Sequence, residues 1–212
     1  MLANWITLAR FPLLLINVLV LYLGSAPVRL AAVGLLFVGL MLDTVDGVVA
    51  RKTGKTSLFG SVLDIAADRT YELVLWICLA NLGMIPLLIP LIVVARTTLT
   101  DAFRSIGVGQ GTAPFAQHQT GLGRFLVTST FMRVGYTVAK TTTFCGLALA
   151  QALSGYPAGT VPAGLMPSMI AGFQLTAWTA VFFCVLRGVP VVAHAVRHFW
   201  FPASVVTRAE AR

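Results

Sequence analysis

The sequence contains very little charge. Only 10% of its residues are Asp, Glu, Lys or Arg, and only seven are acidic, whereas 58% are apolar and the mean hydropathy is +0.88. An ordinary soluble domain carries about 25% charged residues. The composition therefore excludes that class and predicts an integral membrane protein. Because one membrane span needs about 20 residues, 212 residues accommodate roughly six helices and leave no room for a separate soluble domain.

Cysteine is also scarce. The three cysteines, Cys78, Cys145 and Cys184, all lie in apolar runs. Cysteines in such surroundings are typical of buried small hydrophobic residues rather than of a disulfide framework or a metal site.

Apolar stretches bounded by glycine, proline or charge predict six helices, over residues 5–24, 30–52, 57–82, 85–105, 121–154 and 167–188. We therefore expect an all-α polytopic membrane protein that forms one domain over residues 1–212, with an amphipathic, basic tail over 189–212. The fifth helix is long for one crossing, and we expect it either to bend, with Gly135 and Gly146 as candidate weak points, or to extend beyond the bilayer.

Basic residues occur in the connection after the second span, at both ends of the connection after the fourth span, and in the C-terminal tail. The positive-inside rule then places both termini and the acidic end of the second helix in the cytoplasm, for a protein of the cell inner or plasma membrane. The net charge of +8 is spread over these boundary positions. We expect anionic lipid headgroups, and not nucleic acid, as the counter-charge.

Five of the seven acidic residues lie in one short stretch: Asp43, Asp46, Asp64, Asp68 and Glu72. The first two are spaced i, i+3 at the end of the second predicted helix. Asp64 and Asp68 are spaced i, i+4 near the start of the third, so each pair shares a helical face. The short link between the helices lets the two pairs face each other at the cytoplasmic end.

Four carboxylates at a membrane boundary repel one another and lose hydration unless cations hold them. Hard oxygen donors favour Mg²⁺, Mn²⁺ or Ca²⁺ over zinc. We therefore predict a site for two divalent cations, Mg²⁺ or Mn²⁺ being preferred, of the kind that clamps a diphosphate and an attacking oxygen.

Small and basic residues accompany the acids. Gly47 and Ala50 leave space for a ligand, Gly60 lets the two helices approach closely, and Arg51 supplies a cation for phosphates. Each residue alone also suits helix packing or a topology anchor. Together with four acids at fixed intervals, they favour a ligand site.

The run DxxDGxxAR, eight residues, then GxxxDxxxD, from Asp43 to Asp68, resembles the signature of the CDP-alcohol phosphotransferase family. The resemblance implies transfer of a substituted phosphate from a CDP-linked donor to an alcohol, with release of CMP, by a protein that forms homodimers. It implies a catalytic role for Asp68, which would take the proton of the acceptor hydroxyl. The implied metal ligands are Asp43, Asp46, Asp64 and Asp68. The implied CDP-binding residues are Asp43, Gly47, Ala50, Arg51 and Gly60.

Arginines in the fourth and fifth predicted helices point to the acceptor. Their positions are Arg96, Arg104, Arg124 and Arg133. Arginine inside a span is costly and usually faces a polar cavity, and its fork geometry suits phosphate. This predicts a phosphorylated polyol acceptor, glycerol 3-phosphate or inositol phosphate, over serine. The alternative is that Arg96 pairs with Asp101 while Arg104 and Arg124 mark the membrane boundary.

Three segments resemble phosphatidylglycerophosphate synthases within this family: Asn4 to Arg10, Arg96 to Arg104, and Leu122-Gly123-Arg124. The resemblance implies CDP-diacylglycerol as donor and glycerol 3-phosphate as acceptor. Thr97 stands where those enzymes have an acidic residue. Leu122-Gly123-Arg124 corresponds to a Leu-Gly-Lys segment in those enzymes, and the second lysine that follows their segment is absent here. Arg10, deep in the first helix, is expected to face the active-site cavity.

Other hypotheses remain open from the sequence. The donor could be a soluble CDP-alcohol with a lipid acceptor, or the chain could be an inactive scaffold for an active enzyme. A different class, a divalent-cation transporter, also explains acidic residues within a membrane. It leaves the Gly, Ala and Arg positions of the motif unexplained.

Overall fold

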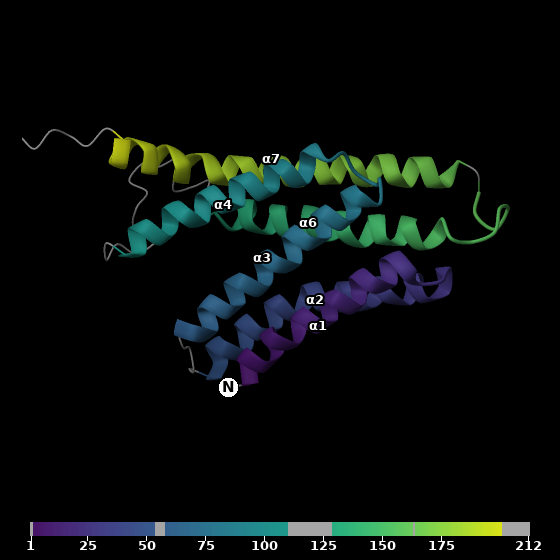
Figure 1. The fold of residues 1–212 in the computed structure, drawn as a ribbon, viewed down its shortest axis with the longest axis horizontal. Helices are drawn as coiled ribbons and strands as arrows, with labels where there is room; N and C mark the ends of the chain where they lie inside the picture. The colour runs from purple at the N-terminus through teal and green to yellow at the C-terminus, as the bar shows by residue number, and fades with distance from the viewer. Residues whose placement is uncertain (1, 54–57, 110–128, 163, 201–212) are drawn as a thin grey trace, which may run out of the picture. The chain divides into compact units, whose positions relative to one another are not determined.

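A computed structural model describes residues 2–53, 58–109, 129–162 and 164–200, and these ranges contain six helices and no strand (Figure 1). The helices are α1 (Leu2–Leu23), α2 (Ala26–Thr53), α3 (Leu58–Asn81), α4 (Leu88–Gly109), α6 (Thr130–Leu153) and α7 (Leu165–Trp200). The expectation of an all-α chain is confirmed over this part of the sequence.

Two details of the helices differ from expectation. The last helix was expected to end at residue 188, but α7 continues through Pro190 to Trp200. The reason is the apolar run beyond Pro190, where Val191 and Ala195 are buried. Their burial offsets the hydrogen bond that proline removes from the helix. Part of the expected tail is therefore helical, and residues 201–212 lie outside the described residues.

The two glycines expected to bend the fifth helix lie in an uninterrupted part of α6, which begins at Thr130. A Cβ atom on Gly146 would overlap the ring of Phe173, and one on Gly135 would lie 3.1 Å from Phe183 Cζ. Both phenylalanines belong to α7. The glycines thus allow close helix packing. Residues 121–128 of the expected helix lie outside the described part.

The chain divides into two compact units. The first comprises Met1–Leu91 and Thr137–Thr179, and the second comprises Ile92–Tyr136 and Ala180–Arg212. Helices α4, α6 and α7 contribute residues to both units.

In the first unit, α1 packs against α2 and α3, and successive helices run in alternating directions (Figure 1). The core side of α3 contains Tyr71, Leu75 and Trp76, all nearly inaccessible to solvent. Gly39 of α2 lies so close to the Tyr71 hydroxyl that a Cβ atom would overlap it. This glycine therefore permits the close approach of α2 to α3.

The rest of the first unit is joined by an aromatic contact and two hydrogen bonds. Trp76 of α3 meets Phe144 of α6 edge to face, with ring centroids 4.7 Å apart. The hydroxyls of Thr143 and Thr176 form a hydrogen bond of 2.8 Å between α6 and α7. Gln174 Nε2 donates a hydrogen bond of 2.8 Å to the Met84 carbonyl, which lies beyond the end of α3. These contacts hold α6 and α7 against the α3 side of the unit.

The second unit also uses aromatic contacts. Phe131 and Phe183 meet edge to face at 6.3 Å, and the Arg187 guanidinium lies over the Tyr136 ring at 5.9 Å. All four residues lie on α6 or α7. This part of α6 therefore packs on α7 through rings.

Two helices of the described chain are long and apolar enough to cross a membrane: Trp5–Leu23, with mean hydropathy 2.1, and Leu165–Ala193, with 1.8. Both expose large apolar side chains, including Trp5, Leu175 and Phe182. In α2 the apolar stretch Ala26–Leu42 is shorter, because the acidic motif follows it. These features are consistent with a membrane protein, while the number of crossings and their orientation stay predictions.

The packing of Gly146 makes a testable prediction. Gly146→Ala should lower stability by about 1–3 kcal/mol, because the added methyl group overlaps the Phe173 ring. Gly172→Ala is the matched control, since that helical glycine has open space around its Cβ position, and alanine favours the helix by about 0.5–1 kcal/mol. Thermal unfolding of both variants in detergent measures the difference. Equal melting temperatures for the two variants would contradict this packing.

Candidate active site

The acidic motif spans the end of α2 and the beginning of α3. Asp43 and Asp46 belong to α2, which ends at Thr53, and Asp64 and Asp68 belong to α3, which begins at Leu58. Because the chain reverses direction between the two helices, both halves of the motif lie at the same end of the helix pair (Figure 1). The side chains of five motif residues lie outside the described residues: Asp43, Asp46, Gly47, Ala50 and Arg51.

Asp64 lies beside a buried arginine. Arg10 of α1 is only 1% exposed, and its Nη1 atom lies 3.7 Å from Asp64 Oδ1. The Arg10 guanidinium also lies over the Tyr71 ring, 5.4 Å from the centroid. The sequence predicted that Arg10 faces the acidic site, and the structure brings it to one of the predicted metal ligands. A cation from α1 therefore partly balances the Asp64 carboxylate.

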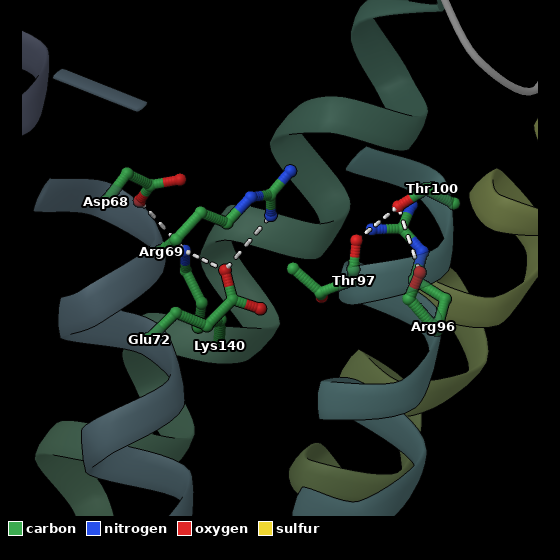
Figure 2. Close-up of polar contacts among 7 residues, drawn as sticks. All are labelled: Asp68, Arg69, Glu72, Arg96, Thr97, Thr100 and Lys140. Atoms are coloured by element: carbon green, nitrogen blue, oxygen red, sulfur yellow. Dashed lines mark hydrogen bonds and ion pairs between the residues drawn. The ribbon is translucent and has the colours of Figure 1, made fainter. Parts of the chain in front are cut away.

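Asp68 lies in a cluster of four charged side chains from α3 and α6 (Figure 2). Lys140 Nζ lies 3.5 Å from Asp68 Oδ1 and 3.2 Å from Glu72 Oε2. Arg69 Nη1 lies 3.9 Å from the same Glu72 oxygen. The lysine therefore bridges two carboxylates that are one helical turn apart on α3.

Burial varies across this cluster. The Glu72 side chain is 1% exposed and that of Lys140 is 10% exposed, whereas Asp68 is 36% exposed. Asp64, one turn earlier on α3, is 46% exposed. Asp64 and Asp68 are thus accessible to a ligand, whereas Glu72 lies inside the protein.

The sequence analysis missed this cluster. It counted Glu72 among the acids without a role, and it did not single out Lys140. One signal was available, because Asp64, Asp68 and Glu72 continue a single i, i+4 row along α3. A second was Lys140, the only charged residue of α6 beyond Arg133.

The described part of the site suits a hard divalent cation. Asp64 and Asp68 offer carboxylate oxygens on one helical face, and both side chains are partly accessible. Within the described residues no group of three or more His, Cys, Asp or Glu side chains converges on one point. The other two predicted ligands, Asp43 and Asp46, have side chains outside that part. The donor chemistry of Asp64 and Asp68 thus fits the predicted metals.

Gly60 lies in the first turn of α3, four residues before Asp64, and is partly buried. This spacing puts it on the same helical face as the acids. Its position is compatible with the predicted contribution to the CDP site.

The predicted acceptor arginines include Arg96, which lines an open groove of about 650 Å³ between α4 and α7 in the second unit. The other groove residues are apolar: Ile92, Ala95, Leu99, Val185, Gly188, Val189, Val192, Ala193 and Val196. Arg96 Nε is buried without a hydrogen bond among the described residues. A Cβ atom on Gly188 would lie 2.7 Å from this nitrogen, so the glycine makes room for the arginine.

Three threonines, Thr97, Thr98 and Thr100, follow Arg96 on α4. The Thr100 hydroxyl lies 3.0 Å from the carbonyl oxygens of both Arg96 and Thr97 and donates toward them (Figure 2). This hydroxyl is therefore used within the helix.

The structure describes only part of the remaining predicted acceptor residues. Arg133 is exposed on α6 in the second unit. Arg104 belongs to α4, but its side chain lies outside the described residues, and so does all of Arg124. Their roles toward the acceptor stay predictions.

All three cysteines are free thiols. Cys78 and Cys184 are buried, and Cys145 is partly buried. The expectation that the cysteines are buried is confirmed for Cys78 and Cys184.

Comparisons with known proteins address the family. No curated protein sequence matches the chain significantly. The family model for CDP-alcohol phosphatidyltransferase matches residues 1–156, which include α1, α2, α3, α4, α6 and the whole acidic motif. The chain therefore belongs to the CDP-alcohol phosphatidyltransferase family, whose members are transferases for substituted phosphate groups.

Proposed function

We propose that this protein transfers a phosphatidyl group from CDP-diacylglycerol to the hydroxyl of glycerol 3-phosphate, releasing CMP. The observation that carries the proposal is the family match over residues 1–156 together with the complete acidic motif from Asp43 to Asp68. Transfer of a substituted phosphate follows from the family. The donor lipid and the acceptor are proposals that rest on the motif and on the arginines.

In the proposed reaction the acceptor oxygen attacks the phosphorus that carries the diacylglycerol. The bond from this phosphorus to the bridging oxygen of the diphosphate breaks, and CMP leaves with that oxygen. Asp68 accepts the proton of the attacking hydroxyl, because an alcohol is a poor nucleophile at neutral pH and needs a base within hydrogen-bond reach. The partial exposure of Asp68 supports this role, since substrate must reach the carboxylate.

Four aspartates, Asp43, Asp46, Asp64 and Asp68, would hold two Mg²⁺ or Mn²⁺ ions. When bound, these ions supply charge stabilisation for the diphosphate and the leaving CMP. Asp43, Gly47, Ala50, Arg51 and Gly60 would bind the CDP part of the donor. The small residues leave space for the nucleotide, and Arg51 adds a positive charge beside the phosphates.

Arginine recognition of the acceptor phosphate completes the proposal, with Arg96, Arg104, Arg124 and Arg133 as the candidate residues. Arg96 supports it best, because it lines the open groove and its buried Nε lacks a hydrogen bond among the described residues. Inositol phosphate is the alternative acceptor, since the same guanidinium groups suit any phosphorylated polyol.

We further propose that the protein is a multi-pass membrane protein with cytoplasmic termini and that it forms a homodimer. The apolar stretches in α1 and α7 support membrane insertion. A donor with two acyl chains would then stay in the bilayer while its CDP head reaches the aspartates from the side.

An acceptor panel tests the reaction. Purified protein with CDP-diacylglycerol and Mg²⁺ or Mn²⁺ should release CMP with glycerol 3-phosphate, and less or none with inositol phosphate, inositol or serine. CMP release measured by chromatography reports the reaction, and mass spectrometry of the lipid product reports the acceptor. CMP release only with another acceptor would show that glycerol 3-phosphate is not the acceptor. Divalent-metal flux in proteoliposomes without any CMP release would favour the transporter.

Replacement of the proposed base gives a second test. Asp68→Asn should lower kcat by about 100-fold or more, because the amide cannot accept the proton, while the folded protein is retained. Asp101→Asn is the matched control, since it makes the same chemical change on α4, outside the motif. Single-turnover CMP release separates the chemical step from product release. Near wild-type turnover by Asp68→Asn would remove Asp68 from the role of base.

The acceptor arginines can be separated from the donor site by kinetics. Arg104→Ala and Arg124→Ala should each raise KM for glycerol 3-phosphate by about tenfold and change KM for CDP-diacylglycerol by less than about twofold. Arg29→Ala is the control, because Arg29 lies near the start of α2, at the opposite end from the acidic motif. Its Nη2 atom donates a hydrogen bond of 3.1 Å to the Tyr22 carbonyl of α1. A larger effect on the donor KM would move these arginines to the donor site.

A further inference from the structure

A buried ion pair lies directly behind the proposed base. Glu72 Oε2 and Lys140 Nζ are 3.2 Å apart, and the two side chains are 1% and 10% exposed. Glu72 lies four residues beyond the last aspartate of the motif, and Lys140 lies far from it in the sequence. A buried pair adds little net stability, because desolvation of both charges offsets their attraction. Its position beside Asp68 therefore calls for another explanation.

The same ammonium group reaches Asp68. Lys140 Nζ lies 3.5 Å from Asp68 Oδ1, so it bridges the exposed aspartate and the buried glutamate (Figure 2). Arg69 Nη1, 3.9 Å from Glu72 Oε2, gives the glutamate a second cation. The cluster thus contains two carboxylates and two cations of the protein.

We propose that Glu72 is a positioning residue for Asp68 and that it acts through Lys140. The proposal rests on the proposed function, in which Asp68 is the base. Glu72 holds the ammonium group from the buried side. The ammonium group in turn restrains the Asp68 carboxylate, whose partial exposure would otherwise allow several rotamers.

The balance of charges explains why the effect of Glu72 on Asp68 depends on Lys140. With Glu72 ionised, the positive charge of Lys140 is shared between two carboxylates. Lys140 then neutralises Asp68 only in part, and the Asp68 carboxylate keeps a net negative charge toward the substrate. Without the glutamate charge, the ammonium group attracts the Asp68 carboxylate more strongly and draws it toward α6. Loss of Glu72 should therefore disturb Asp68 only while Lys140 is present.

A double-mutant cycle tests this dependence. Glu72→Gln should lower kcat by about tenfold, with KM for CDP-diacylglycerol changed by less than about twofold. It should also weaken Mn²⁺ binding by about threefold, measured by electron paramagnetic resonance of free Mn²⁺, because Asp68 is a proposed ligand. In a Lys140→Met background, Glu72→Gln should change neither quantity by more than about twofold. Losses that multiply in the double variant would overturn the proposal.

A control separates positioning from general destabilisation. Leu79→Ala removes a buried apolar side chain of α3 about two turns beyond Glu72 and leaves the charges intact. It should lower the melting temperature while kcat of the folded protein and Mn²⁺ affinity stay at wild-type values. If Leu79→Ala reproduces the kinetic loss of Glu72→Gln, the glutamate has only a structural role.

Two further measurements keep the test decisive. If Glu72→Gln does not fold, Glu72→Asp keeps the charge with a shorter reach and should lower kcat by about threefold, so a wild-type kcat would overturn the proposal. If wild-type protein releases no CMP with any acceptor, the proposed function fails, and the Mn²⁺ cycle still decides the positioning role. If CMP is released and Glu72→Gln changes neither kcat nor Mn²⁺ affinity, the positioning role fails and the proposed function stands.

Discussion

Charge compensation within an apolar chain is the constraint on which the candidate site depends. A carboxylate packed among apolar helices is costly unless a cation lies nearby, and each described acid of α3, buried or partly exposed, has one within 3.7 Å. Arg10 of α1 lies beside Asp64, and Lys140 of α6 lies between Asp68 and Glu72. The acidic row therefore joins three helices of the first unit, and it does so at the end of α3 where the family motif lies.

The apolar side of α3 gives this row a firm base. Ala67, Tyr71, Leu75 and Leu79 form a buried i, i+4 row beside the acidic one. Gly39 allows α2 to reach the Tyr71 hydroxyl, and Phe144 of α6 packs on Trp76. One helix thus combines two functions. Tyr71 and Trp76 pack against α2 and α6, and the acidic row carries Asp64 and Asp68 of the family motif.

The sequence predicted much of this architecture because the signals are local. Apolar runs of helical length predicted six helices, and the spacing of the aspartates put each pair on one helical face. The predicted end of the last helix, at residue 188, was wrong. Pro190 is a local stop signal, but the burial of Val191 and Ala195 outweighs it. Gly135 and Gly146 were interpreted as weak points, whereas their partners Phe183 and Phe173 on α7 give them a packing role.

The sequence by itself determined the all-helical fold, the family and the acidic motif, since apolar helical runs and motif spacing are local properties of the chain. Only the tertiary structure decided which cations accompany the acids. Lys140 is 68 residues from Glu72 along the chain, and no periodicity connects them. The same holds for Arg10 and Asp64, which meet because α1 packs on α3. Such pairs depend on how helices pack, and that packing is set by the sum of many apolar contacts and not by any single motif.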